Sequence, residues 1–258
     1  MPNLVGRIAM EALLSPLLQV STMDLLALSP PGWGGNLLRG LMNSVYIAAG
    51  AYALGLLIGT GGAYGKLYGG PVVRDLLEGY TTLVRAVPEL VLILLIYFAG
   101  ADLINRLLEA LGYTRIDING LTAGIVVLGF VQGAYATEVL RGAILAVPQG
   151  QLEAARAYGM PPLLMLRRIT LPAMLPYAIP GLANLWLIAT KDTALLAIVG
   201  FSELTQETRQ AAGATKAYFT FYLAAGALYL ALTLVSNVII ARVERWSRRG
   251  MPSIGGPA

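Results

Sequence analysis

The sequence contains no cysteine and no histidine. Without thiols and imidazoles the chain cannot form disulfides, a Ser-His-Asp triad, or a haem or zinc site with His or Cys ligands. Charged residues make up only 12% of the 258 residues, about half of the roughly 25% that is usual in soluble domains. These shortages argue against a water-soluble enzyme.

Hydrophobic residues are abundant instead, at 57% of the chain with a mean hydropathy of +0.68. A bilayer core of about 30 Å needs about 20 helical residues. Four uncharged runs reach that length: 26 residues between Arg39 and Lys66, 20 between Asp117 and Glu138, 22 between Arg168 and Lys191, and 25 between Lys216 and Arg242. We therefore expect an all-α membrane protein.

A fifth span is less obvious, because the uncharged run from Leu90 to Ala101 has only 12 residues. Extending the helix back to about Glu78 gives it membrane length, but it then carries Arg85 and Glu89. Charges at that depth either belong to a substrate pathway or are neutralised by snorkelling and pairing within the bundle. We predict five spans, near residues 40–64, 78–100, 119–138, 171–192 and 217–241.

The positive charges fall mainly on one side of these spans. Eleven Lys and Arg residues share one side: Lys66, Arg74, Arg85, Arg141, Arg156, Arg167, Arg168, Arg242, Arg245, Arg248 and Arg249. The opposite side has six: Arg7, Arg39, Arg106, Arg115, Arg209 and Lys216. Because cytoplasmic loops carry an excess of Lys and Arg, we predict an amino terminus outside and a carboxyl terminus in the cytoplasm.

Residues 1–36 are interrupted by Glu11 and Asp24 and are expected to be an interfacial or loosely ordered extension.

Glycines are frequent in the first span, where Gly55 and Gly59 form one GxxxG pattern and Gly61 and Gly65 another. Such small-residue faces indicate close helix packing in general. The segment from Gly59 to Lys66 also resembles a phosphate-binding loop, but Thr60 and Leu67 break the Walker A pattern. If ATP drives this protein, another polypeptide binds it.

The longest cytoplasmic loop, residues 148–172, is predicted to contain a short surface helix. Pro148 precedes it, Gly159 suits a left-handed helix end, and Pro161-Pro162 forces a break before the next span. Such a helix can lie in the groove of a partner and transmit a rigid-body movement, or it can rest on lipid headgroups.

The same loop resembles the EAA loop of permease subunits in bacterial ABC importers. The matching residues are Glu153-Ala154-Ala155, Gly159 six positions after Glu153, and Ile169-x-Leu171-Pro172. The resemblance runs from about Gly32 to Arg249 and is closest to Q-type subunits of the histidine/lysine/arginine/ornithine and octopine/nopaline group. The segments that carry this finer match are residues 78–91, 116–118, 133–142, 191–195 and 233–237, although Ala86 replaces a usual glycine.

The resemblance implies a type I importer permease, multi-pass in the bacterial inner membrane, with residues 37–249 as the transmembrane domain and 250–258 as a tail. It implies a second permease subunit as a homodimer or heterodimer partner, two cytoplasmic ATPase subunits that bind ATP and magnesium, and an extracytoplasmic amino-acid-binding protein. The chain itself is expected to hold no cofactor, metal or nucleic acid and to catalyse no reaction. Its expected cargo is polar, cationic L-amino acids, moved by alternating access.

Three groups of functional residues follow. For docking to the ATPase, the candidates are Glu153, Ala154, Ala155, Arg156, Gly159, Ile169, Leu171 and Pro172. For the substrate pathway they are Glu89, Asp192, Lys191, Thr193, Asn184, Trp186 and Arg85, although Lys191 and Asp192 can also form an internal pair and Asn184 and Trp186 can simply pack. Glu138 and Arg141 are expected to pair on one helix. The alternative functions are an ion-coupled transporter, a channel, or a scaffold subunit without substrate contacts.

Overall fold

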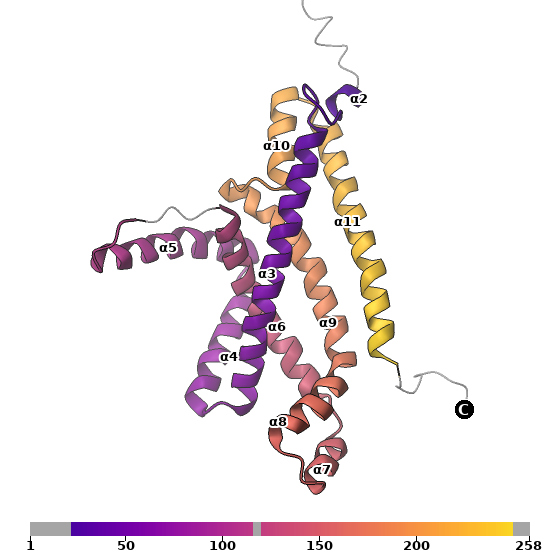
Figure 1. Cartoon of the computed structure of the whole chain (residues 1–258). Helices are drawn as coiled ribbons and strands as arrows, with labels where there is room; N and C mark the ends of the chain where they lie inside the picture. Colours follow the sequence, from indigo (N-terminus) through magenta and orange to yellow (C-terminus); the bar gives the residue numbers. More distant parts are fainter. Residues whose placement is uncertain (1–21, 116–119, 250–258) are drawn as a thin grey trace, which may run out of the picture.

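The computed structural model describes residues 22–115 and 120–249, and the part of the chain that it describes is helical without strands (Figure 1). Most of the expected amino-terminal extension, the matching segment 116–118 and the tail 250–258 therefore lie outside the described residues. Five helical segments have the length and hydropathy to cross a membrane. They are α3 (Gly34–Tyr68), α5 (Glu89–Ala110), α6 (Gly120–Leu145), the segment Pro162–Val199, and α11 (Tyr218–Ser247). The five predicted spans are confirmed in number.

The second predicted span is wrong as a single helix over residues 78–100. Helix α4 (Pro71–Ala86) ends before Val87 and Pro88, and α5 begins at Glu89. Val87 is extended, with φ −93° and ψ 139°, because a residue that precedes proline avoids the helical region, and Pro88 has no N–H to continue the helix. Helix α4 runs beside α3, whereas α5 points away from the bundle (Figure 1). The membrane-length helix of this region is α5 alone.

The centre of the bundle is the packing of α3 on α6. Gly55 and Gly59 face α6 so closely that a Cβ added at Gly59 would lie 2.5 Å from the Cβ of Ala136, and one at Gly55 would lie 2.8 Å from the Cβ of Gln132. A Cβ at Gly61 would meet nothing within 4 Å. The first GxxxG pattern is thus a helix contact inside this chain, which small residues permit by allowing close backbone approach.

Gly59→Ala is expected to lower the free energy of unfolding by about 1–3 kcal/mol, because the added methyl overpacks the contact with α6. Gly61→Ala is the matched control and should be neutral or stabilising by up to about 1 kcal/mol, since it only removes the helix-destabilising effect of glycine. Denaturant titration of the purified protein in mild detergent measures both. Equal changes in the two variants would contradict the close contact.

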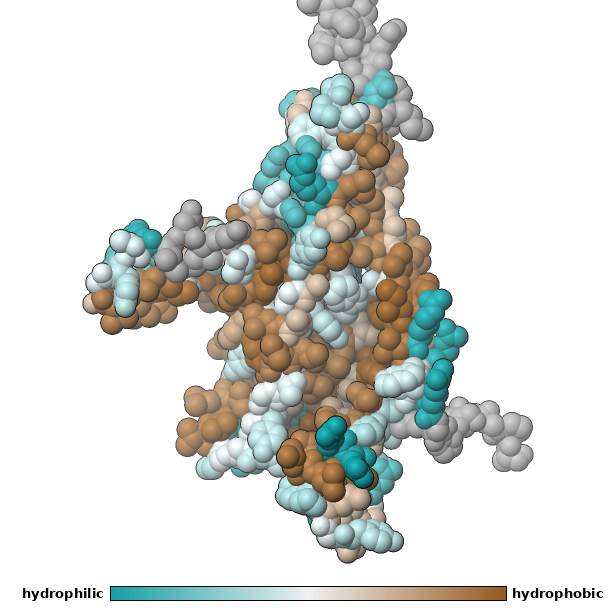
Figure 2. Space-filling view, viewed as in Figure 1, coloured by the Kyte–Doolittle hydropathy of each residue, from teal (hydrophilic) through white to brown (hydrophobic). Residues whose placement is uncertain are grey.

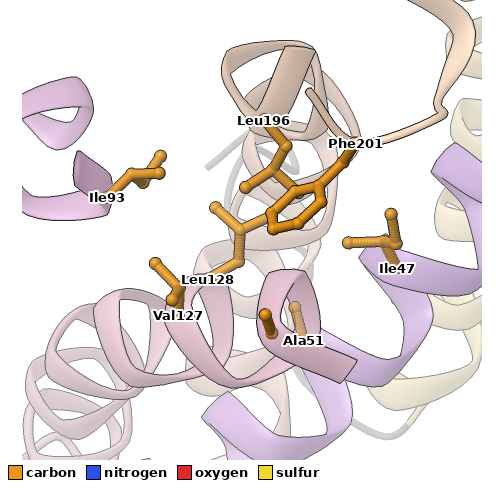
Figure 3. Packing of buried hydrophobic residues seen from close by; sticks show 8 residues of the cluster. Ile47, Ala51, Ile93, Val127, Leu128, Leu196 and Phe201 are labelled. Carbon is orange, nitrogen blue, oxygen red and sulfur yellow. The ribbon is translucent and has the colours of Figure 1, made fainter. Parts of the chain in front are cut away.

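The fourth apolar segment is irregular along its length. It comprises α8 (Pro162–Met165), the π-helical turn η1 (Leu166–Thr170), α9 (Leu171–Asp192) and the 3₁₀ helix η2 (Thr193–Val199). Gly200, at φ 85°, ends η2, and the chain then places Phe201 beside Leu196 in a cluster with Ile47 and Leu128 (Figure 3). This packing fixes the carboxyl end of α9, and with it Asp192, against α3 and α6.

Glu203 is a fully buried carboxylate that the sequence analysis did not single out. It caps α10 (Leu204–Thr215) by accepting a hydrogen bond from the Gln206 N–H at 2.8 Å. It also accepts from the hydroxyls of Ser44 on α3, at 3.3 Å, and Tyr229 on α11, at 3.0 Å. Burial raises the pKa of the Glu203 carboxyl, while the hydrogen bonds oppose that rise. Glu203 therefore ties α10 to two membrane helices.

Candidate functional site

Helix α7 (Gln149–Ala157) lies at one tip of the molecule, at the same end as the carboxyl terminus of α11 (Figure 1). Glu153, Ala154 and Arg156 are exposed, whereas Ala155 is buried. Gly159 has φ +70°, its N–H donates to the Arg156 carbonyl at 2.9 Å, and the chain reverses there. The exposed residues of this loop are thus presented on a fixed turn.

The later part of the EAA-like pattern lies where η1 meets α9. Ile169 is half-buried and lines a hollow with Pro172 and with Gln151 of α7, so it joins the loop helix to the following span. Leu171 is 44% exposed and points outward. The structure therefore brings Ile169 and Pro172 to α7 and leaves Leu171 on the surface.

An ionic network centred on the buried Lys66 lies between α3, α4 and α6. Glu138 contacts Arg141 of the same helix at 2.8 Å, and it also contacts Lys66 of α3 at 2.5 Å. The Lys66 ammonium, whose side chain is 3% exposed, reaches Glu78 at 2.5 Å and the Thr81 hydroxyl at 2.9 Å. Lys66 thus holds three helices together.

The predicted span 40–64 leaves Lys66 outside the membrane helix, whereas α3 extends to Tyr68 and includes it. One available signal was its helical spacing, because Lys66 follows Gly59 and Gly62 at intervals of three and four and so shares their buried face.

The two carboxylates proposed for the substrate pathway meet, although they are far apart in sequence. Glu89 begins α5, Asp192 ends α9, and their carboxyl groups are close enough to interact. Gln132 of α6 is buried and its amide Nε2 lies 3.4 Å from Asp192 Oδ2, while its carbonyl Oε1 has no hydrogen-bond partner in the described structure. The Tyr135 hydroxyl, also on α6, interacts with Glu89.

This carboxylate cluster, Glu89, Asp192, Gln132 and Tyr135, lies where α5 begins and α9 ends. Breaks in helices leave backbone groups and charges available for a polar ligand at membrane depth. Gln132 and Tyr135 were missed from the sequence, although Gln132 is a strongly polar residue inside an apolar run and that polarity was the available signal.

The cationic neighbours of the cluster are both exposed. Lys191 interacts electrostatically with Asp192, and Arg85, near the end of α4, interacts with Tyr135. The Thr193 hydroxyl is buried and donates to the Thr190 carbonyl at 2.9 Å, which makes it part of the turn between α9 and η2.

Trp186 and Asn184 take different positions on α9. The Trp186 indole N–H donates to the Ser236 hydroxyl of α11 at 3.0 Å, and its ring meets Tyr52 of α3 edge-on at 5.6 Å. Asn184 is exposed on the surface of this subunit. Trp186 is therefore held in a packing contact between helices.

Comparison with known proteins gives a consistent answer. The nopaline transport system permease protein NocQ of Agrobacterium fabrum is 41% identical over 90% of this chain and 99% of its own length. The histidine/lysine/arginine/ornithine transport system permease protein HisQ of Escherichia coli is 41% identical over 83% of this chain and 94% of its own.

Solved structures agree with these relatives. The crystal structure of an amino acid ABC transporter with histidines superposes with a TM-score of 0.71 at 28% identity, covering 83% of this chain and 94% of that one. The MetNI methionine ABC transporter shares the fold, with a TM-score of 0.63 at 20% identity over 83% of this chain and 99% of that one. The family model for binding-protein-dependent transport system inner membrane components matches residues 51–249. The chain is a multi-pass inner-membrane protein, and it belongs to this family of permease components.

Proposed function

We propose that the chain is the permease subunit of an ABC importer that carries polar, cationic amino acids into the cytoplasm by alternating access. The observation that carries the proposal is the meeting of Glu89 and Asp192 at broken helix ends, beside a buried Gln132 carbonyl with an unused acceptor. Relatives whose names specify nopaline and the basic amino acids support the substrate class. Nothing in the family match favours a channel or an ion-coupled transporter.

The proposed assembly contains a second permease subunit, two cytoplasmic ATPase subunits that bind ATP and magnesium, and an extracytoplasmic binding protein. We place α7 in the cytoplasm, because eleven Lys and Arg residues were assigned to that side against six on the other. Closure of the ATPase dimer would then push α7 through contacts with Glu153 and Arg156. The rigid turn at Gly159 and the Ile169 contact would transmit the movement into α9.

Recognition of a cation follows from the charges of the cluster. Two neighbouring carboxylates repel each other, and a substrate ammonium or guanidinium placed between them relieves that repulsion. The free Oε1 of Gln132 can accept a further N–H from the same group. Arg85 and Lys191, on the exposed rim, are suited to the carboxylate of the amino acid.

Asp192→Asn should lower the uptake of arginine at least about tenfold relative to the uptake of citrulline, its uncharged isostere, because only the charged side chain loses a charge-assisted contact. The measurement is competitive uptake of both labelled amino acids by the complete transporter in proteoliposomes. Asp102→Asn is the control, since Asp102 is exposed and pairs with Arg106 on the surface of α5. An equal loss for both substrates would assign Asp192 to a structural role.

A further inference from the structure

Two hollows follow one another along the crevice between α9 and α11. The first, of about 320 Å³, is lined by Arg168, Pro176, Ser247 and Arg249 together with Gln151 of α7. The second, of about 380 Å³, is lined almost entirely by apolar side chains, among them Ile179, Leu182 and Ile240, with Trp186 and Tyr52 on its walls. Neither belongs to the carboxylate cluster.

The hollows adjoin on both helices. On α9 the first includes Pro176 and the second begins at Ile179, three residues later, while on α11 the second includes Val243 and the first includes Ser247, four residues later. Three or four residues are one helical turn, so these residues are neighbours on the same face. The crevice therefore has a polar end beside α7 and an apolar stretch that runs into the membrane.

Charge distinguishes the two ends. Arg168 and Arg249 are both exposed at the polar end, where Gln151 and Ser247 add uncharged polar groups, and the described residues that line the two hollows include no Asp or Glu. Figure 2 shows the same change on the visible face of α11, where hydrophobic surface gives way to hydrophilic surface toward its carboxyl end. Two guanidinium groups that share a hollow lined by no carboxylate are suited to binding a phosphate.

We propose that this crevice binds an anionic glycerophospholipid. Arg168 and Arg249 hold its phosphate, and one acyl chain lies along the apolar hollow toward Trp186. A membrane supplies such a molecule at this depth, and a cationic pocket between helices combined with an apolar groove matches both of its parts.

A bound lipid would also contact the loop of residues 148–172, which we call the coupling loop because of its proposed contact with the ATPase. Gln151 belongs to α7 and Ile169 to η1, and both line the polar hollow, so a headgroup there contacts the loop helix and the span that it moves. The lipid is therefore a structural ligand that links α7 to α9 and α11, independently of which amino acid is carried.

Lipid retention by the assembled transporter tests the proposal. The complex is reconstituted in mixed phosphatidylglycerol and phosphatidylcholine, purified in detergent, and its bound lipid is identified by native mass spectrometry. We expect phosphatidylglycerol to be retained and the double variant R168Q/R249Q to retain at least about tenfold less. The control R242Q/R245Q removes the same charge from α11 residues that line neither hollow and should retain lipid normally.

Two further measurements separate the possible sources of the phosphate. Ile240→Trp, which fills the apolar hollow, should also reduce retention, and soluble glycerol 3-phosphate should not displace the lipid. Equal retention of the two lipids, equal loss in both double arginine variants, or displacement by glycerol 3-phosphate would overturn the proposal. Circular dichroism and gel filtration of each complex establish that the variants are folded.

Discussion

Gly159→Asp is expected to abolish amino-acid uptake while leaving the chain folded in the membrane. Gly159 has φ +70° and is exposed, and a Cβ added there would meet nothing within 4 Å. Asp costs roughly 1–2 kcal/mol in the left-handed region, which a folded bundle can tolerate. If the ATPase docks on α7 as proposed, the large effect arises at this partner, where the new carboxylate would prevent its close approach to the turn after α7. Loss of about 2 kcal/mol of docking energy is typical of an interface hot spot. It lowers the affinity of the ATPase for this loop, and with it ATP-driven uptake, about thirtyfold or more.

The matched control is Gly112→Asp. Gly112 also has a positive φ, +82°, and open space around its Cβ, but it follows α5, far along the chain from α7. The same substitution there carries the same backbone cost without touching the coupling loop. Uptake of labelled arginine and substrate-stimulated ATP hydrolysis are measured in proteoliposomes for both variants. Normal uptake by the Gly159 variant, or an equal loss in the Gly112 variant, would refute a coupling role for this turn.

Hydropathy was sufficient to predict four of the five membrane helices, because an uncharged run of 20 or more residues has few alternatives to a span. It failed at Val87-Pro88, because the mean hydropathy of a segment does not indicate a helix break. The break follows from the local chemistry of proline. The exposed loop with Glu153 and Gly159 was identifiable because its pattern is local in sequence.

The contacts between distant segments were not predictable in the same way. Glu89 and Asp192 were each chosen as charges at membrane depth, but nothing in the sequence indicates that the start of α5 meets the end of α9. Gln132 completes that cluster from the middle of an apolar run. Lys66 ends such a run, and one of its partners, Glu138, is 72 positions away. From the sequence alone, a charge next to an apolar run indicates only the boundary of a span. Its buried partner is known from the structure.

Lys66→Met is expected to lower the free energy of unfolding by about 3 kcal/mol or more. Met keeps the length of the side chain but removes the ammonium, so the partly buried Glu138 carboxylate retains only Arg141, and the buried Thr81 hydroxyl loses its donor. The contact with Glu78 contributes little, because that carboxylate is 64% exposed. Denaturant titration in detergent measures the loss. Arg106→Met, which breaks the exposed pair with Asp102, is the control and should change stability by less than about 1 kcal/mol.

A second substitution separates the cost of an unpaired charge from the loss of packing. If the destabilisation of Lys66→Met comes from Glu138 left without its ammonium, then Lys66→Met combined with Glu138→Leu should recover most of the lost stability, because replacing a buried ion pair with apolar groups is often neutral. No recovery would mean that Lys66 stabilises the bundle through its methylene stem. Because Lys66 joins α3 and α4 to the end of α6 that leads into α7, a double variant that is stable yet transports poorly would show that the network also sets the position of the coupling loop.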